Sequence, residues 1–170
     1  IGNTSGSTTL TMGANTIWQG SSTSKEMAVN MKSNGTWYNT GASTIKHWTS
    51  QRSDYQAATI DMTDSKAGDV TIDNYNGKTF VMYKHDEKTP GTISGGNITI
   101  GHADAGSSII MSTDNTGIDT NNLYAVDSVL SALAEKLTYS GYIGKAEENL
   151  KGYVQIAEGL TSRSVVKATG

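Results

Sequence analysis

Aspartate side chains are the first candidates for chemistry in this chain, because paired carboxylates can cleave glycosidic bonds by general acid–base catalysis. The pairs nearest in sequence are Asp61 with Asp64, Asp69 with Asp73, and Asp114 with Asp119. Cleavage needs two carboxyl groups about 5–9.5 Å apart with separated pKa values. Asp61 and Asp73 could become such neighbours if they lay one coil apart in a coiled structure. We expect exposed carboxylates at strand ends and turns, and we assign no catalytic residue.

Histidines are the candidate metal ligands, and the chain has three: His47, His85 and His102. A metal site needs several ligands with supporting geometry. His85 and Asp86 are adjacent, and adjacent strand residues point to opposite faces, so these two are badly placed to chelate one ion. His102 and Asp104 could share a face, but the glycines around them predict a turn. The chain also has no cysteine. We therefore predict no metal site and no cofactor, and solvated turn positions for these residues.

The aromatic residues are the remaining candidates for ligand binding. The chain has three Trp and eight Tyr but a single Phe. Tyr and Trp suit surfaces where one end of the ring meets water and the ring can stack on a sugar or a partner protein. Trp37, Tyr38, Tyr55 and Tyr75 are the predicted binding residues, in a groove along the side of the molecule. The alternative is a ladder of stacked rings inside the fold.

Short apolar clusters separated by turn residues indicate that these candidates are carried on β-strands. Ile60, Val70 and Phe80 mark three such clusters ten residues apart. The turns between clusters contain pairs such as Asn34-Gly35 and Asn76-Gly77, which accept positive φ at low cost. This spacing fits a sandwich, a barrel or a β-solenoid. Very short clusters and the abundance of Thr, Ser, Asn and Gly, more than a third of the chain, favour the β-solenoid, a parallel β-helix.

One segment has helical periodicity instead. Leu123, Val126, Leu130, Leu133 and Leu137 follow each other at spacings of three and four residues, which predicts an amphipathic helix over residues 122–137. Residues 119–121 offer N-capping oxygens, and residues 140–141 can end the helix. We expect its leucines to cover the side or the end of the β-solenoid.

Composition excludes several classes of function. The formal net charge is −3, so no basic excess is available to bind nucleic acid. No run approaches the roughly 18–20 apolar residues that cross a bilayer, so we predict no membrane insertion by this segment. The absence of cysteine fits export from a bacterium, because a chain that crosses a membrane unfolded would be hindered by premature disulfides. The first residues form neither a charged nor an apolar signal region, which suggests a fragment or a processed chain.

About half of the chain, residues 30–115, resembles the C-terminal passenger region of pertactin-like bacterial autotransporters. The run over residues 70–86, VTIDNYNGKTFVMYKHD, has that family's short strand, glycine turn and aromatic-bearing strand. Residues 98–100 and 109–111, on either side of a Gly/Ala-rich turn, match the next coil, and residues 35–45 match its tryptophan-bearing coil. The resemblance implies a right-handed parallel β-helix on, or released from, a bacterial surface.

The predicted organisation is all-β: β-helix coils over residues 1–120, a packing helix over 121–138, and further coils over 139–170 that continue beyond the fragment. The expected function is non-enzymatic: an adhesin or structural stalk of an autotransporter-like protein, whose passenger could template its own folding. Expected partners are protein or glycan ligands on host or neighbouring cells and adjacent coils of the same parent chain. Two alternatives stay open: a polysaccharide-active or tail-spike-like β-helix, and a self-associating surface filament or surface-layer subunit.

Overall fold

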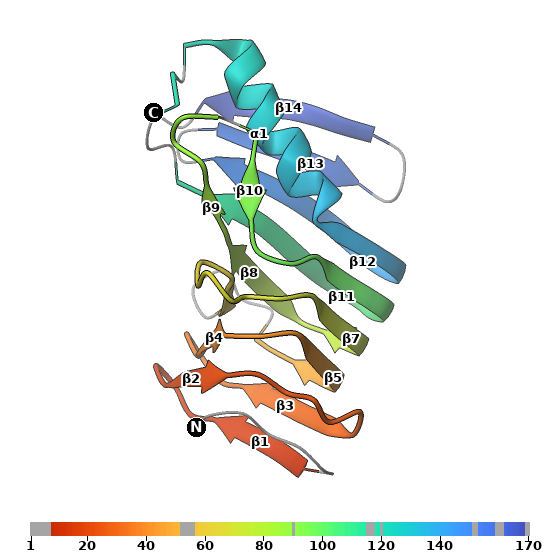
Figure 1. Cartoon of the computed structure of the whole chain (residues 1–170). Coiled ribbons are helices and arrows are strands. Elements are labelled where there is room, and N and C mark those ends of the chain that lie inside the picture. Colours follow the sequence, from red (N-terminus) through yellow and green to blue (C-terminus); the bar gives the residue numbers. More distant parts are fainter. Residues whose placement is uncertain are drawn as a thin grey trace.

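In the computed structural model, a single parallel sheet coils around a narrow core (Figure 1). The structure describes residues 8–51, 57–89, 91–114, 118–119, 121–150, 153–158 and 162–168, the backbone alone after residue 140. One face consists of the strands β1 (Thr8–Met12), β3 (Met27–Met31), β5 (Ser43–Thr49) and β7 (Val70–Asn76). The other consists of the strands β2 (Ile17–Gly20), β4 (Thr36–Asn39), β6 (Ala58–Asp61) and β8 (Lys78–Met82).

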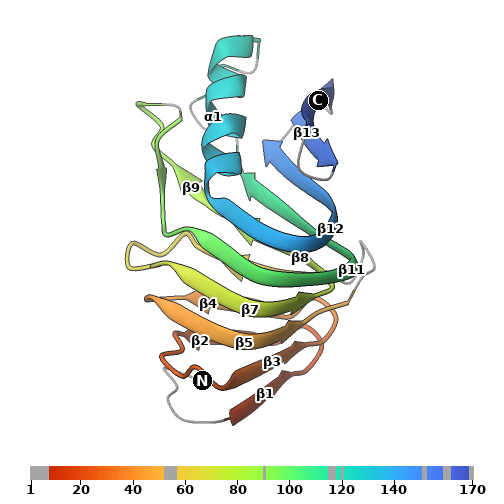
Figure 2. The ribbon, with the colours of Figure 1, turned by 90° about the vertical axis from the view of Figure 1, so that its right-hand side faces the viewer.

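The two faces are joined by one long strand, β11 (Ile98–Thr113). Its first part pairs with β7 and its second part with β8, both in parallel. Strand β12 (Leu137–Leu150) then pairs in parallel with β11 over both parts (Figure 2). The sheet thus runs in parallel from β1 and β2 up to β12, which confirms an all-β parallel β-helix with one helix.

Aligned apolar side chains fill the core because the strands stay in register. Trp18 lies opposite Trp37, and Trp37 opposite Ile60, on β2, β4 and β6. Val29, Trp48 and Tyr75 line up in the same way on the facing strands β3, β5 and β7. All six side chains are buried. Burial alternates along these strands with period two, as expected when successive residues point to opposite faces.

Turn residues with positive φ separate the strands, as the sequence predicts. Asn15 (φ 59°) and Asn34 (φ 57°) occupy the same turn of successive coils, just before β2 and β4. Gly77 has φ 124°, and a Cβ atom there would lie 2.3 Å from the carbonyl oxygen of Ser50. Only glycine fits both the dihedral angle and the close approach of the neighbouring coil.

The helix α1 (Leu123–Glu135) lies inside the predicted range and ends two residues earlier. It buries Val126, Val129, Leu130 and Leu133. Leu123 is 69 % exposed, so its predicted place in the buried stripe is wrong. The structure shows this residue as the first of the helix, at the end away from β12 (Figure 2). Within the described part of the chain, no helix is long and apolar enough to cross a membrane.

The residue that caps the helix also differs from the prediction, which places the N-cap within residues 119–121. Asn122 is the N-cap, and its Oδ1 accepts hydrogen bonds from the amides of Tyr124 and Ala125, at 3.1 and 3.3 Å. Asp119 instead accepts a bond from the amide of Asn121, at 3.0 Å. Thr120 lies outside the described residues. At the other end Lys136 is the C-cap, and Leu137 already belongs to β12.

The last strands depart from the parallel pattern. Strands β13 (Tyr153–Glu158) and β14 (Ser162–Ala168) pair antiparallel, β13 with β12 and β14 with β13. The prediction of further β-helix coils after residue 139 is therefore wrong for these two strands. Short connections bring the chain directly back beside the preceding strand, and this favours antiparallel pairing over a full coil.

Candidate functional site

A hairpin and a helix protrude together from the regular coils. Strands β9 (Lys84–His85) and β10 (Ile93–Ser94) pair antiparallel, and the amide of Asp86 donates to the carbonyl of Thr92 at 2.8 Å. This hairpin, residues 84–94, interrupts the chain between β8 and β11, and α1 interrupts it between β11 and β12. We call the hairpin and α1 the projection. Both lie toward the same end of the β-helix (Figures 1 and 2).

Two close contacts hold the halves of the projection together. A Cβ atom on Gly91 would lie 3.2 Å from the Cβ of Ser128, so the hairpin backbone runs directly against α1. Lys136, at the end of α1, donates from Nζ to the carbonyl oxygen of Gly95, the residue directly after the hairpin, at 2.7 Å. A cavity of about 320 Å³ lies between the hairpin and α1, beside Gly91 and Lys136. The hairpin and the helix thus form one structural unit.

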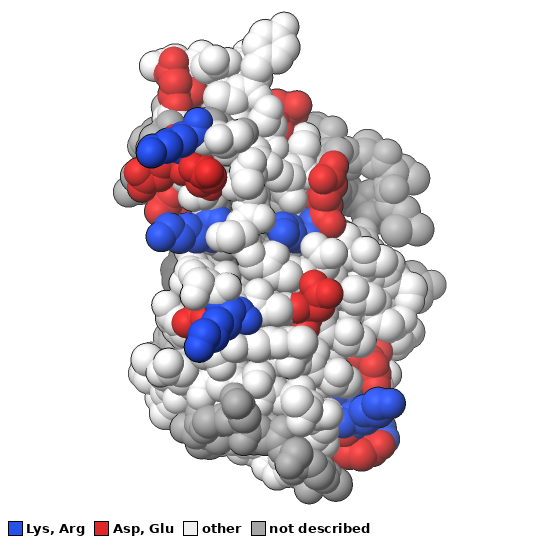
Figure 3. Space-filling model, viewed as in Figure 1, with Lys and Arg blue, Asp and Glu red and all other residues white. Residues whose placement is uncertain are grey.

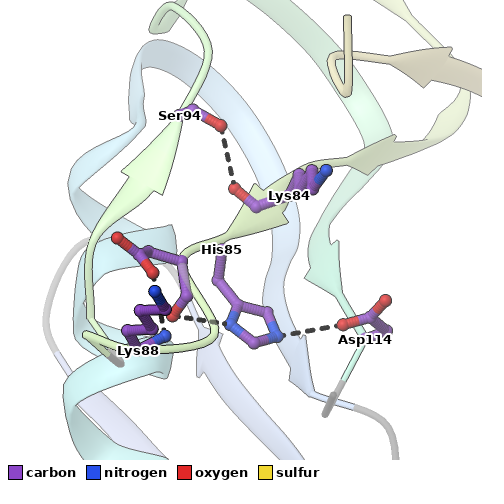
Figure 4. Close-up of polar contacts among 6 residues, drawn as sticks. Lys84, His85, Lys88, Ser94 and Asp114 are labelled. Carbon is purple, nitrogen blue, oxygen red and sulfur yellow. Dashed lines mark hydrogen bonds and ion pairs between the residues drawn. The ribbon is translucent and has the colours of Figure 1, made fainter. Parts of the chain in front are cut away.

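The imidazole of His85 sits at the base of this unit. Its Nε2 lies 2.9 Å from Oδ1 of Asp114, and its Nδ1 lies 3.3 Å from the backbone oxygen of Asp86 (Figure 4). The side chain of His85 is 1 % exposed, whereas that of Asp114 is 64 % exposed. Asp114 directly follows β11, so the contact ties the hairpin to the chain that leads toward α1. Both ring nitrogens are engaged, so the arrangement suits fastening of the hairpin rather than proton transfer to a substrate.

A larger cavity, of about 640 Å³, opens between the hairpin and the turn that follows β6. Its lining consists of hydroxyl groups, charges of both signs, the His85 ring and one aliphatic side chain: Thr63, Ser65, Lys84, His85, Asp86, Glu87, Lys88, Thr92, Ile93 and Ser94. Lysines lie close to Asp and Glu around the projection, and no large patch of one sign covers the face seen in Figure 3. This chemistry fits a neutral, hydroxyl-rich ligand better than a polyanion.

The possible pairing of Asp61 with Asp73 does not form. Asp61 lies on β6 and Asp73 on β7, in opposite faces of the β-helix, so the two are not side-by-side neighbours. Asp61 Oδ1 accepts bonds from the amide and the hydroxyl of Thr63, at 2.9 and 2.6 Å. Asp64 and Asp69 likewise accept bonds from backbone amides in turns. These carboxylates stabilise the connections between strands, as expected for exposed turn residues.

The two histidine–aspartate groupings are placed differently from the prediction. His102 and Asp104 lie within β11 rather than in a turn. His102 Nε2 lies 3.6 Å from Asp104 Oδ1, and both side chains are more than half exposed. His85 is buried instead of solvated, because its partner is Asp114 rather than the adjacent carboxylate. A separation of 29 residues hides that pair from a search of local sequence. In the described residues no three His, Asp or Glu side chains form a possible metal site.

Trp37 and Tyr75, two of the four predicted binding aromatics, belong to the core. Trp37 is fully buried and stacks on Trp18, with ring centroids 4.6 Å apart and planes at 7°. Tyr75 is 1 % exposed, and its hydroxyl donates to the carbonyl of Ser108 at 2.6 Å. Their predicted exposure is therefore wrong, and for these two the alternative of rings stacked or packed inside the fold describes the structure. The inward direction of alternate strand residues is the physical reason.

The other two predicted aromatics lie elsewhere. Tyr38 is half-buried on the outer side of β4, and its hydroxyl lies 3.2 Å from that of Thr63, which lines the larger cavity. It therefore remains a candidate, next to the cavity rather than inside it. Tyr55 lies outside the described residues. Of the hairpin residues that line the cavity, the sequence analysis singles out His85 and Asp86 alone, and the charged run of residues 84–88 marks a solvent-facing connection.

Comparison with known proteins found no relative of this chain. The chain matches no family model, no curated protein and no solved structure.

Proposed function

We propose that this chain is a non-enzymatic segment of a bacterial surface or secreted protein, in which a stiff β-helical stalk carries an adhesive projection. One observation carries the proposal: the parallel pairing of strands continues from the first strands to β12 although two insertions interrupt the chain. A solenoid of this kind extends by adding coils, and each coil contacts only its neighbours. Such an architecture suits a spacer that holds a binding element away from an anchor.

The projection is the part of the chain that fits the role of contact surface. It combines a cavity lined by hydroxyl and charged groups with a helix end that exposes Leu123 and Tyr124, which are 69 % and 88 % exposed. Exposed aromatic and polar groups together suit protein or glycan ligands. We infer that ligands on a host or a neighbouring cell bind here, with Tyr38 at the border of the cavity.

Bacterial origin and autotransporter-like export rest on the resemblance of residues 30–115 to pertactin-like passengers and on the absence of cysteine. In this proposal the adjacent coils of the parent chain are partners in folding, because the edge of each coil offers backbone hydrogen bonds to the next. The end coils then template the folding of the coils that precede them in the chain.

Binding by the projection can be tested with the purified chain on immobilised glycans and on cultured host cells. We expect binding that is lost when residues 86–92 are replaced by a short glycine-containing turn. A matched control carries Thr9→Ser and Lys32→Gln on the first coils, remote from the projection in sequence and fold. Equal binding by both variants would contradict the projection as the contact surface.

Two further measurements separate the alternatives. Shortening of a polysaccharide by the purified chain would favour the polysaccharide-active β-helix and contradict a non-enzymatic role. Filaments in electron micrographs of the purified chain would favour the self-assembling subunit. To test templated folding, residues 70–111 can be deleted from the full parent chain. Unchanged secretion and protease resistance of the upstream coils would contradict that role.

A further inference from the structure

We propose that a row of outward side chains beside the larger cavity, Gln19, Tyr38 and Asp61, binds a neutral glycan that stacks on the Tyr38 ring. The three residues lie on the neighbouring parallel strands β2, β4 and β6, with Gln19 opposite Tyr38 and Tyr38 opposite Asp61. They alternate with the buried residues of these strands, so all three point out of the core. The inference rests on the proposed function and narrows its ligand from a protein or glycan to a neutral glycan.

The row continues into the larger cavity through Thr63. The side chain of Thr63 lines that cavity, and its hydroxyl lies 3.2 Å from that of Tyr38. The amide and the hydroxyl of Thr63 also donate to Asp61 Oδ1, at 2.9 and 2.6 Å. The row spans two strand spacings, roughly 10 Å, and the cavity extends this surface beyond Thr63. An elongated ligand of several sugar units therefore fits the surface better than a single small molecule does.

The hydrogen bonds among these groups run in one direction. A hydroxyl has a single proton, and that of Thr63 points to Asp61 Oδ1, so the hydroxyl of Tyr38 is the donor to Thr63. The phenol oxygen of Tyr38 then offers a lone pair, rather than a proton, to a ligand. Within the described residues, both bonds that Asp61 accepts go to Oδ1, which leaves Oδ2 as a further acceptor. The site therefore selects ligands that donate hydrogen bonds, as sugar hydroxyl groups do.

The charge of the row disfavours an acidic glycan. Asp61 is its one charged residue, and a carboxylate repels the carboxylates or sulfates of an acidic polymer. The cavity beside the row balances Lys84 and Lys88 against Asp86 and Glu87, so it adds no excess of positive charge that would attract such a polymer. A neutral polymer meets neither repulsion nor a need for a basic partner.

Tyr38 supplies an apolar contact that hydrogen bonds alone do not provide. Its ring is half-buried on the outer side of β4, so it is held in place while part of it meets solvent. Such a ring can stack on the apolar face of a sugar. Gln19 and Asp61 flank it at one strand spacing on either side, where they can bond the hydroxyl groups around the edge of the stacked sugar. A few polar groups around an apolar contact are what fix the orientation of a ligand.

Affinity electrophoresis of the intact chain tests the row with soluble polymers as probes. Mannan, galactan and dextran are the neutral probes, and polygalacturonate is the acidic comparison. We expect at least one neutral polymer to retard the unaltered chain and polygalacturonate to leave its migration unchanged. Retardation by polygalacturonate alone would overturn the proposal, and so would the lack of retardation by every neutral polymer. In either case, adhesion of the same chain to cultured host cells would leave the proposed function standing.

Tyr38→Ala is the decisive variant, and Tyr38→Phe is its matched partner. Loss of the ring should raise the dissociation constant for the neutral polymer about tenfold, whereas loss of the hydroxyl alone should raise it about threefold. Thermal unfolding checks that each variant is folded at the assay temperature. Unchanged binding by Tyr38→Ala would overturn the row as the binding site, and an equal loss in both variants would overturn stacking on the ring.

Asp61→Asn tests the preference for neutral polymers without altering the ring. The amide keeps an oxygen for Thr63 and replaces the Oδ2 acceptor with an uncharged N–H donor. We expect binding of the neutral polymer to weaken about threefold and binding of polygalacturonate to become measurable. Asp73→Asn is the matched control, because Asp73 is exposed on β7 in the opposite face, and it should leave the migration with both polymers unchanged. The same behaviour in the two variants would overturn the role of Asp61.

Discussion

Trp18 and Trp37 stack face to face inside the β-helix, with ring centroids 4.6 Å apart and planes at 7°. They occupy equivalent positions on β2 and β4, so one coil places its indole directly on that of the next. The ring of Trp48, on the opposite face of the β-helix, has its centroid 5.9 Å from that of Trp37. The three rings connect three successive coils. The packing of the core at this end of the β-helix therefore depends on them.

Replacement of the central ring should be strongly destabilising. We expect Trp37→Ala to lower the free energy of unfolding by about 3–5 kcal/mol, because a large buried ring leaves a cavity between two coils. Denaturant titration followed by circular dichroism measures this loss, and the near-ultraviolet signal of the stacked indoles should weaken with it. Tyr38→Phe, at the adjacent outward position, is the control and should cost no more than about 1 kcal/mol. Similar losses in the two variants would contradict the importance of the stack.

A methyl group at Gly77 should disturb the contact between neighbouring coils. The positive φ of 124° is strained for any other residue, by about 1–3 kcal/mol, and the added Cβ would meet the Ser50 carbonyl at 2.3 Å. We therefore expect Gly77→Ala to lower the midpoint of thermal unfolding clearly. In Gly13→Ala the new Cβ has its nearest neighbour at 3.7 Å, so this control should unfold close to the original temperature. A harmless Gly77→Ala would mean that the two coils can separate locally without loss of stability.

Two buried tyrosines should make the protein sensitive to alkali. Burial raises the pKa of Tyr75 and of Tyr83 above the ordinary value of 10.0. Since the folded-state pKa is the higher one, this contribution to stability is complete below about pH 10 and is lost as the pH rises toward the folded value. We expect unfolding in strong alkali to coincide with a late step in tyrosinate absorbance. In Tyr75→Phe that step should become smaller, whereas ionisation of all tyrosines near pH 10 without unfolding would contradict the burial.

The helix of the projection should depend on its cap. Asn122→Ala removes the two hydrogen bonds that the Asn122 side chain accepts from the first turn of α1, and it should cost about 1 kcal/mol. Faster hydrogen exchange in the first turn of α1 would report this loss. The neighbouring change Asn121→Ala leaves both capping bonds in place and should leave exchange in the helix nearly unchanged. If both variants behaved alike, the helix end would be held by packing rather than by its cap.

The sequence predicts the fold well because its signals are local. Apolar clusters at Ile60, Val70 and Phe80, with an Asn-Gly turn between the last two, lead to short strands in a solenoid, and the stripe from Val126 to Leu133 leads to the helix. The direction of each side chain is harder to predict. Trp37 and Tyr38 are neighbours in one strand, yet one is buried and the other half-buried, because pairing with the adjacent coils decides which of them faces inward.

The site is less predictable than the fold, because its contacts connect separate insertions. His85 and Asp114 come together only when the hairpin folds back beside the end of β11. The antiparallel pairing of β13 and β14 depends in the same way on how the chain returns, since their apolar pattern also suits parallel coils. Sequence spacing holds no information on such pairs until the order of strands in the sheet is known.

The parallel pairing on both sides of the hairpin has a consequence for how such a protein can vary. Val70 lies opposite Ile98 and Thr79 opposite Ile109, so the strand that follows the inserted hairpin pairs in parallel with both strands that precede it. The length and composition of the inserted hairpin can thus change without a change in how the coils stack along the β-helix. Evolution, or protein engineering, can exchange the hairpin for another loop while the parallel strand pairing of the β-helix stays as it is.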